Sequence, residues 1–136
     1  MLDLSSLEAA LDSLDSAISI SVRTQADEAM RRVLRAGVIQ NFEFTYELSW
    51  KMIRRWIRAN VSPEDADPRT RKDLFRLAAR ERLVDDPMPW FDYANARNIT
   101  SHVYDDAKAK EVYETTLRFA DDARRLLDAL KQSNDD

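Results

Sequence analysis

The residues between positions 97 and 104 combine side chains that can bind a phosphate with one that can move a proton. They include Arg97, Asn98, Ser101, His102 and Tyr104. The guanidinium of an arginine is a permanent cation that can donate two hydrogen bonds to one phosphate. Histidine titrates near neutral pH, and His102 is the single histidine of the sequence. This combination indicates phosphodiester chemistry, in which Arg97 stabilises developing charge and His102 acts as general acid or base.

RNA is the phosphodiester that such a site can cleave without a metal, because its 2′-hydroxyl supplies the nucleophile. The sequence contains no cysteine, which excludes a thiolate nucleophile and a cysteine-based metal site, and a single histidine argues against zinc. We therefore expect neither a metal nor another cofactor. Cleavage needs both an acid and a base, so a two-fold dimer would complete the site with two copies of His102 and two of Arg97.

Helical geometry limits how these side chains can meet. At about 100° per residue, Arg97, Ser101 and Tyr104 share one helical face, whereas Asn98 and His102 share another. Arg97 and His102 converge on one target if the helix ends or distorts between them, or if a second subunit supplies the missing partner. The alternative is structural: Arg97 pairs with a carboxylate and His102 satisfies a helix end. Spacing alone favours that alternative, since an isolated Arg-x4-His is a weak signal.

Two carboxylates further upstream, Glu43 and Glu47, lie four residues apart and so share a helical face. Glu47 precedes Lys51 by four residues, the favourable order for a helical ion pair, and this favours a structural role for both glutamates. In the less favoured alternative, Glu43 points into the Arg97 cleft and holds the guanidinium. Tyr46 and Trp50 have the spacing of core residues and are expected to pack rather than to stack on bases.

The composition favours long helices as the elements that position these residues. Glycine occurs once, at Gly37, and the four prolines all lie within residues 63–89, so most of the sequence lacks the residues that make turns. With 136 residues, 44% hydrophobic and 34% charged, the chain has the size and balance of one folded domain spanning residues 1–136. We predict an all-α, up-and-down bundle of about five helices.

Apolar residues recur at spacings of three and four in the first half of the sequence, as on the buried faces of helices. They predict a first helix over residues 4–18, opened by a capping box of Ser5 and Glu8. A second helix is predicted over about 25–59, where the apolar stripe is widest. That helix should be the most buried, with a kink or break at Gly37 because glycine weakens a helix interior.

Turn and capping residues divide the second half. Asp67 and Pro68 are placed to cap and open a third helix, which should run to about Leu83. Residues 85–89 predict a connector, and a fourth helix leads from there into the segment that carries the histidine. The aspartates at 105–106 can cap the last helix.

Charge and hydropathy restrict the possible locations and partners. No window of 18 apolar residues and no secretory signal is found, which predicts a cytoplasmic protein without a membrane span. A net charge of −4 argues against a surface that binds nucleic acid non-specifically, although a local RNA site is compatible with it. The middle of the sequence has a positive bias, which is either a solvated face or an RNA track. It comprises Arg54, Arg55, Arg58, Arg69, Arg71, Lys72, Arg76 and Arg80.

Two motifs together resemble a known group of helical proteins. The set Arg97-x4-His102-x-Tyr104 resembles the HEPN superfamily, whose motif is an arginine, four to six residues, and a histidine. The run Ile39-Gln-Asn-Phe-Glu-Phe-Thr-Tyr-Glu-Leu-Ser-Trp-Lys51 is similar to the second-helix signature of the nucleotidyltransferase substrate-binding proteins, also called HepT-like toxins. Phe75, Arg76 and Trp90 follow in the order seen in that family, so the resemblance covers essentially the whole sequence.

The resemblance implies a five-helix bundle that forms a homodimer and is paired with a minimal nucleotidyltransferase (MNT). In the toxin interpretation, the dimer is a metal-independent endoribonuclease of a toxin–antitoxin pair. Arg97 would then bind the phosphate, His102 would act as acid or base, and Asn98, Ser101 and Glu43 would contact RNA or orient the site. The partner would act as antitoxin by attaching AMP to Tyr104. Alternatively, the chain is a non-catalytic subunit that presents substrate to the nucleotidyltransferase.

Overall fold

The computed structural model describes residues 2–67 and 70–133. Within these ranges the chain forms five α-helices and no strand, which confirms the predicted all-α bundle. The helices are α1 (Ser5–Arg23), α2 (Glu28–Asn60), α3 (Arg71–Arg80), α4 (Pro87–Ile99) and α5 (Asp106–Ser133), with a 3₁₀ turn at Thr100–His102 between α4 and α5.

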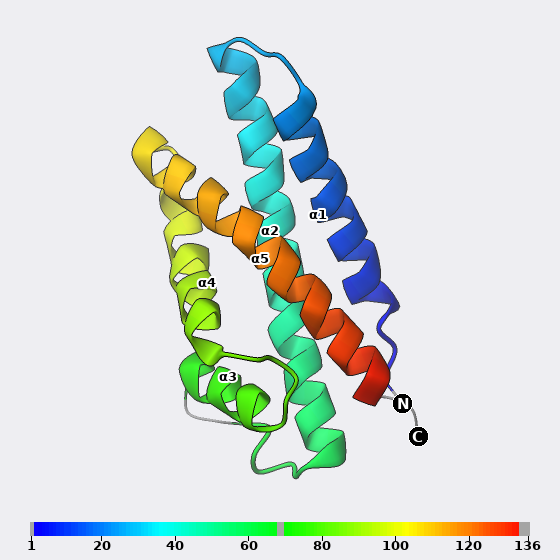
Figure 1. Cartoon of the computed structure of the whole chain (residues 1–136). Coiled ribbons are helices and arrows are strands. Elements are labelled where there is room, and N and C mark those ends of the chain that lie inside the picture. Colours follow the sequence, from blue (N-terminus) through cyan, green and yellow to red (C-terminus); the bar gives the residue numbers. More distant parts are fainter. Residues whose placement is uncertain (1, 68–69, 134–136) are drawn as a thin grey trace.

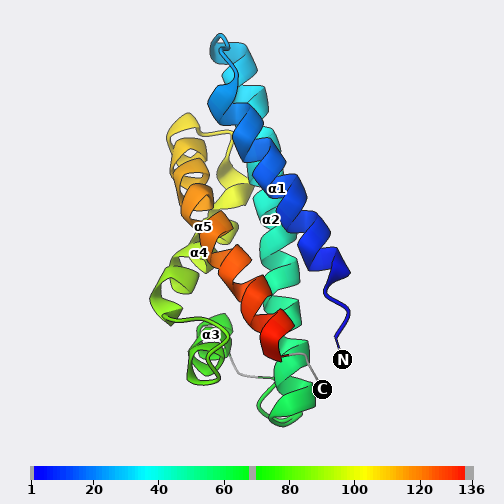
Figure 2. The ribbon, with the colours of Figure 1, turned by 45° about the vertical axis from the view of Figure 1, so that its right-hand side comes forward.

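The four longer helices alternate in direction (Figure 1). Helices α1 and α2 lie side by side as an antiparallel pair, and α5 crosses the bundle diagonally in front of α2. The short α3 lies near the C-terminal end of α2 and packs mainly against α4 (Figure 2). This arrangement fixes α4, which carries the arginine of the motif, between α3 and α5.

A cluster of aromatic rings holds α4 in place. Phe119 of α5 packs edge-on against Phe42 of α2 and against Trp90 and Tyr93 of α4, with centroid distances of 5.0, 5.8 and 5.1 Å. Phe75 of α3 joins this cluster through Trp90, at 5.3 Å. Each buried ring contributes about 1.5–3 kcal/mol through the area it removes from water, and favourable ring geometry adds about 0.5–1.5 kcal/mol per pair. The elements around the motif are therefore fixed by a well-packed core.

Helix α2 is the longest helix and has a wide buried stripe, as predicted. The stripe comprises Val38, Ile39, Phe42, Thr45, Tyr46, Ser49, Met52, Ile53, Trp56 and Ile57. Helix α2 has no break at Gly37, because it continues through this position. A Cβ added at Gly37 would meet no atom within 4 Å. The packing of this chain therefore places no steric demand for glycine there.

Two predicted helix caps were wrong because other polar groups compete for the same positions. At the start of α1, the Asp3 carboxylate accepts hydrogen bonds from the backbone N–H and the hydroxyl of Ser5, so the predicted Ser5–Glu8 capping box does not form. A carboxylate is a stronger acceptor than the hydroxyl that the box would have used.

At the start of α3, too, the capping residue differs from the predicted Asp67. Thr70 caps the helix by accepting the backbone N–H of Asp73. Asp67 instead lies 3.6 Å from both Arg54 and Arg58 of α2. The predicted role of Pro68 lies outside the described residues. The helix ends at Arg80, before the predicted Leu83.

Helix α4 begins inside the predicted connector 85–89. Asp86 accepts the backbone N–H of Met88, and Pro87 occupies the first helical position, where a missing N–H costs no hydrogen bond. At the start of α5, Asp105 accepts the backbone N–H groups of Ala107 and Lys108, which confirms the predicted cap.

Candidate functional site

Arg97 lies in the last turn of α4, with its guanidinium between α4 and α2. Its Nη1 is 3.2 Å from Glu43 Oε2 and its Nε is 3.3 Å from Glu47 Oε1. The three side chains are 34%, 33% and 36% exposed. The Nε atom is buried and is not aligned for a hydrogen bond. Two carboxylates of α2 thus contact the guanidinium at Nη1 and Nε, while part of the side chain remains open to solvent.

Thr100 fixes the same guanidinium from the end of its own helix. Its buried hydroxyl accepts a hydrogen bond from Arg97 Nη1 at 2.8 Å and donates one to the Arg97 carbonyl oxygen at 2.7 Å. Thr100 is not among the site residues predicted from the sequence. The available signal was a threonine three residues after the arginine, where a hydroxyl can bond back to the carbonyl of the preceding turn. Arg97 is therefore positioned by groups from both helices.

His102 lies beyond the end of α4. The helix ends at Ile99, and Thr100–His102 form a 3₁₀ turn, so the helix does end between the two motif residues. The His102 side chain is exposed, and its ring packs against Tyr104 with a centroid distance of 6.0 Å. Within the described part of the chain, no hydrogen bond, ion pair or ring contact joins His102 to Arg97. The fold positions them near one helix end but leaves them unpaired.

The other predicted residues of the segment are largely open to solvent. Asn98 and Ser101 are exposed, and the Ser101 hydroxyl donates to the Asn98 carbonyl oxygen at 3.3 Å. Tyr104 is 85% exposed. Because the helix has ended, Ser101 and Tyr104 do not continue the face of Arg97 as an unbroken helix would require.

The predicted ion pair between Glu47 and Lys51 is wrong. Glu47 faces Arg97, and its Oε2 accepts the indole N–H of Trp50 at 3.0 Å. An exposed helical pair contributes only about 0.2–0.5 kcal/mol, so a partly buried arginine from another helix competes well for the same carboxylate. Glu43 has the arrangement of the less favoured alternative, in which it holds the guanidinium of Arg97. The pair of glutamates is thus a contact between helices.

Tyr46 lies close to this cluster and is buried, as its core spacing predicted. Burial raises the pKa of Tyr46 to about 12, although the positive charges of Arg71 and Arg97 oppose the shift. The phenol is therefore neutral near pH 7. Trp50 is partly buried, and the guanidinium of Arg71 covers one side of its ring.

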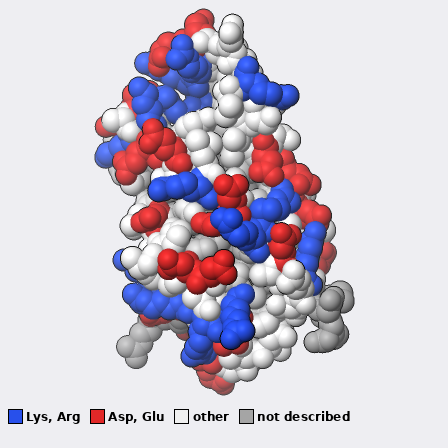
Figure 3. Space-filling view, viewed as in Figure 1, with Lys and Arg blue, Asp and Glu red and all other residues white. Residues whose placement is uncertain are grey.

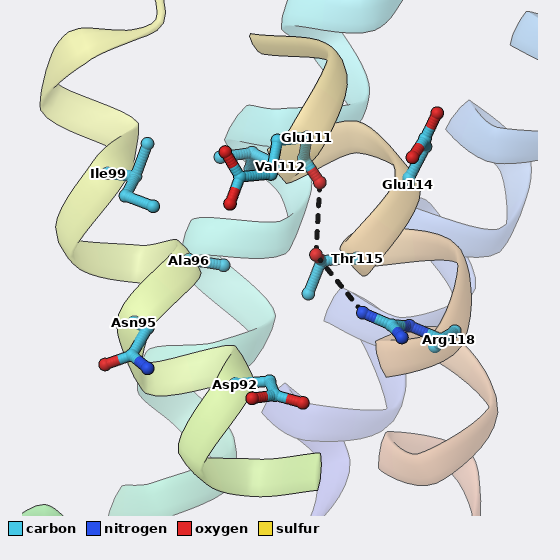
Figure 4. A pocket seen from close by; sticks show the side chains of 9 residues that line it. All are labelled: Asp92, Asn95, Ala96, Ile99, Glu111, Val112, Glu114, Thr115 and Arg118. Carbon is cyan, nitrogen blue, oxygen red and sulfur yellow. Dashed lines mark hydrogen bonds between the residues drawn. The ribbon is translucent and has the colours of Figure 1, made fainter. Parts of the chain in front are cut away.

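A separate groove of about 580 Å³ lies between α4 and α5 (Figure 4). Asp92, Glu111 and Glu114 line it together with one cation, Arg118, whose guanidinium donates to the Thr115 hydroxyl. This excess of carboxylates disfavours a polyanion such as RNA.

Among residues 2–67 and 70–133, no group of three or more histidine, aspartate or glutamate side chains is placed to hold a metal ion. None of the helices described there is long and apolar enough to cross a membrane.

Comparison with known proteins identifies relatives over nearly the whole chain. A Haemophilus influenzae protein named "Probable ribonuclease HepT" is 39% identical over 138 residues, which cover 98% of this chain and 94% of the relative. A solved H. influenzae structure, described as revealing the fold of a substrate binding domain of a nucleotidyltransferase, superposes with a TM-score of 0.88. It is 38% identical and covers 96% of this chain and 100% of its own.

A Thermus thermophilus protein shares the fold, with a TM-score of 0.74 and 23% identity over 91% of this chain and 98% of its own. The family model described as "Nucleotidyltransferase substrate binding protein like" matches residues 2–132. The matched range includes both motifs and all the residues that surround Arg97. The chain therefore belongs to the family of nucleotidyltransferase substrate binding protein-like, or HepT-like, proteins.

Proposed function

We propose that this chain is a metal-independent endoribonuclease that acts on RNA in the cytoplasm, with Arg97 and His102 as its catalytic residues. The observation that carries the proposal is the combination of a held but partly open guanidinium with an exposed imidazole just past the same helix end. The relationship to a protein named as a probable ribonuclease supports it.

In the proposed reaction, the 2′-oxygen of the RNA attacks the adjacent phosphorus, and the bond from phosphorus to the 5′-oxygen breaks. One histidine accepts the proton of the 2′-hydroxyl, and a second acid donates a proton to the departing 5′-oxygen. Arg97 stabilises the negative charge on the non-bridging oxygens. Among the described residues none accepts a hydrogen bond from Arg97 Nη2, so these donors are available to a phosphate. Asn98 and Ser101 would orient the strand.

Since each chain has one histidine, the second proton transfer requires His102 of another copy, and we include a homodimer in the proposal. An exposed apolar side chain on α2 supports this: Phe44 is 59% exposed and follows Glu43 directly. Light scattering at micromolar concentration should give a dimer for the wild type and a monomer for Phe44→Glu. Met88→Glu is the matched control, because Met88 is equally exposed, at 61%, but lies on α4. A monomeric wild type would contradict the dimer.

The catalytic assignment is tested with a labelled RNA in the presence of EDTA. Cleavage should persist without metal and should fall about 10²–10⁴-fold in Arg97→Ala and in His102→Ala. Asn95→Ala, an exposed polar residue of α4 outside the motif, should cleave like the wild type. The samples must show by mass that Tyr104 carries no AMP. Failure of a folded, unmodified dimer to cut several RNAs would refute the ribonuclease.

We further propose that the chain is the toxin of a toxin–antitoxin pair and that a minimal nucleotidyltransferase attaches AMP to Tyr104. The tyrosine oxygen would attack the α-phosphorus of ATP, releasing pyrophosphate and the phenolic proton. Tyr104 is well exposed and its ring contacts that of His102, so AMP there would add bulk and negative charge beside the catalytic imidazole. The modification would inhibit cleavage without unfolding the chain.

The modification is tested by incubating the chain with the partner enzyme and ATP. Mass spectrometry should find one AMP on Tyr104 of the wild type and none on the Tyr104→Phe variant. The control is Tyr113→Phe, which removes a hydroxyl that is hydrogen-bonded with Ser21, and this variant should be modified like the wild type. Expression of the chain alone should arrest growth, and His102→Ala should relieve the arrest. AMP found on Tyr113 instead would contradict the assignment.

The second candidate is a non-catalytic subunit that presents substrate to the nucleotidyltransferase. It is favoured by the description of the related solved structure as a substrate binding domain, and by the separation of Arg97 from His102 within one chain. In that case both residues hold a ligand. This candidate predicts nucleotide or RNA binding without cleavage, and binding that is weakened by Arg97→Ala.

A further inference from the structure

Four basic side chains, one on α2 and three on α3, lie over aromatic rings. The guanidinium carbon of Arg71 is 3.3 Å from the centroid of the Trp50 ring, and Lys51 Nζ is 5.7 Å from the same centroid. Lys72 Nζ and the guanidinium carbon of Arg76 lie 5.5 and 5.1 Å from the centroid of Phe91. We call these the ring-held cations: Lys51, Arg71, Lys72 and Arg76.

A ring orients a cation but, unlike a carboxylate, does not neutralise it. Within residues 2–67 and 70–133, neither Lys51 nor Arg71 nor Lys72 has a carboxylate at ion-pair distance; Arg76 alone also pairs with Asp73, at 2.9 Å. Arg124, by contrast, is paired with two aspartates of α1. The ring-held cations therefore retain positive charge for a ligand from outside the chain.

The ring-held cations are connected to Arg97 through Trp50 and Glu47. The indole N–H of Trp50 donates to Glu47, and the other oxygen of that carboxylate lies 3.3 Å from Arg97 Nε. On α4, Phe91 precedes Asn98 by two helical turns on the same face, which corresponds to about 10 Å along the helix axis. Figure 3 shows several basic side chains at the lower end of the molecule, over α3 and the loop after it, with acidic side chains among them.

The opposite side of α4 has the wrong charge for an RNA strand. It borders the groove with Asp92, Glu111 and Glu114 (Figure 4), where a phosphodiester would meet three carboxylates. A strand bound at Arg97 therefore gains favourable electrostatic energy if it leaves the motif toward α3, and loses it if it leaves toward α5.

We propose that the ring-held cations form a phosphate-binding subsite for the RNA strand that flanks the cleaved bond, with Trp50 and Phe91 as the rings that orient them. This inference rests on the proposed ribonuclease function. Three of the basic residues in the middle of the sequence, Arg71, Lys72 and Arg76, are thereby assigned to the subsite. Three others there are paired within the chain: Arg54 and Arg58 share Asp67, and Arg80 pairs with Glu81.

The test measures RNA binding in a His102→Ala background, so that the probe stays intact. A fluorescent single-stranded RNA of about 12 nucleotides is titrated at several salt concentrations. The test variant is Lys51→Ala with Lys72→Ala, because both lysines are exposed and neither makes an ion pair in the described structure. Loss of two contacts to a single strand should reduce the slope of log K against log salt by roughly 1.4, which weakens binding about tenfold or more near 0.1 M salt.

The matched control is Arg23→Ala with Lys131→Ala, which removes the same charge from α1 and α5 and should change the affinity less than about twofold. Phe91→Leu, which keeps apolar volume but removes the ring, should weaken binding by a few-fold while Lys72 and Arg76 remain. Equal losses in the two double variants would overturn the subsite in favour of a general charge effect.

Other outcomes separate the subsite from the function on which it rests. If the Lys51/Lys72 variant binds RNA normally while the wild type still cuts RNA in EDTA, the subsite is wrong and the ribonuclease stands. If that variant binds RNA normally but no longer binds the nucleotidyltransferase, the surface is a protein interface and the subsite is again wrong. If the wild type neither binds nor cuts RNA, the ribonuclease and the subsite both fail.

Discussion

Arg97 and His102 are separated by four residues in sequence but have opposite environments. The guanidinium of Arg97 contacts Glu43, Glu47 and the buried Thr100, so groups from two helices restrict it. His102 is exposed in a 3₁₀ turn, and its ring contacts only another exposed ring, that of Tyr104, among the aromatic contacts of the described chain. Arg97 is packed between helices of the bundle, whereas His102 is exposed on its surface.

The difference in environment matches the two roles in the proposed reaction, which are charge stabilisation by Arg97 and proton transfer by His102. A preorganised cation needs no rearrangement when charge develops on a phosphate, and this is the form of stabilisation that a folded core can supply. Proton transfer depends on where the substrate oxygens lie, so the imidazole can be placed by the RNA or by a second protomer. Arg97 should therefore matter for both stability and catalysis, whereas His102 should matter for catalysis alone.

The largest expected contrast is in stability. Arg97→Ala leaves Glu43 and Glu47 facing each other without their cation and removes a donor to Thr100, which should lower the free energy of unfolding by about 1–2 kcal/mol after allowance for solvent screening. His102→Ala should change it by less than about 0.5 kcal/mol. Urea unfolding of both variants at one pH measures this. Equal losses would show that the two environments do not differ in solution.

A smaller effect is expected when the link between Arg97 and its helix end is removed. Thr100→Val keeps the side-chain shape but loses two hydrogen bonds, so it should cost about 1 kcal/mol of stability and also reduce RNA cleavage. Thr116→Val is the control, because this buried threonine of α5 bonds to the Val112 carbonyl away from the motif. The Thr116→Val variant should be less stable than the wild type and should cleave RNA at the wild-type rate. A Thr100→Val variant that cuts RNA normally would show that Arg97 is positioned without it.

The smallest effects are expected from the carboxylates. Glu43→Gln and Glu47→Gln keep an oxygen acceptor but remove one charge beside Arg97, so each should change the free energy of unfolding by less than about 1 kcal/mol. Cleavage should fall by less than about tenfold, with a larger effect for Glu47 because it also accepts from Trp50. Glu28→Gln, whose exposed carboxylate pairs with Arg32, should leave cleavage unchanged. A loss as large as that of His102→Ala would make the glutamate a catalytic residue.

The sequence predicted the helices well because their signals are local and repeated. The long stripe of α2 and the capping aspartate Asp105 before α5 were interpreted correctly, since periodicity and capping act within a few residues. Predictions failed where two local groups compete, as with Asp3 against the Ser5–Glu8 box, or where a partner comes from afar, as with Asp67 and the arginines of α2.

The site was predictable in its residue types and less so in its contacts. The motif identified Arg97 and His102, but the preference for a Glu47–Lys51 pair considered one helix at a time and could not include an arginine from α4. Thr100 was missed because a threonine between two motif residues carries no signal until the helix end is known. Its burial depends on how α4 packs, which no short window of sequence contains.

The early end of α4 also bears on the variable spacing of the motif that this chain resembles. In a continuous helix, each inserted residue would rotate His102 by about 100° around the axis, and one insertion would redirect it. Here the helix ends at Ile99, and the residues that follow include an exposed Ser101 and His102. Insertions in such a turn lengthen a surface loop without changing the register of the core. Relatives with one or two more residues between arginine and histidine can therefore keep the same bundle.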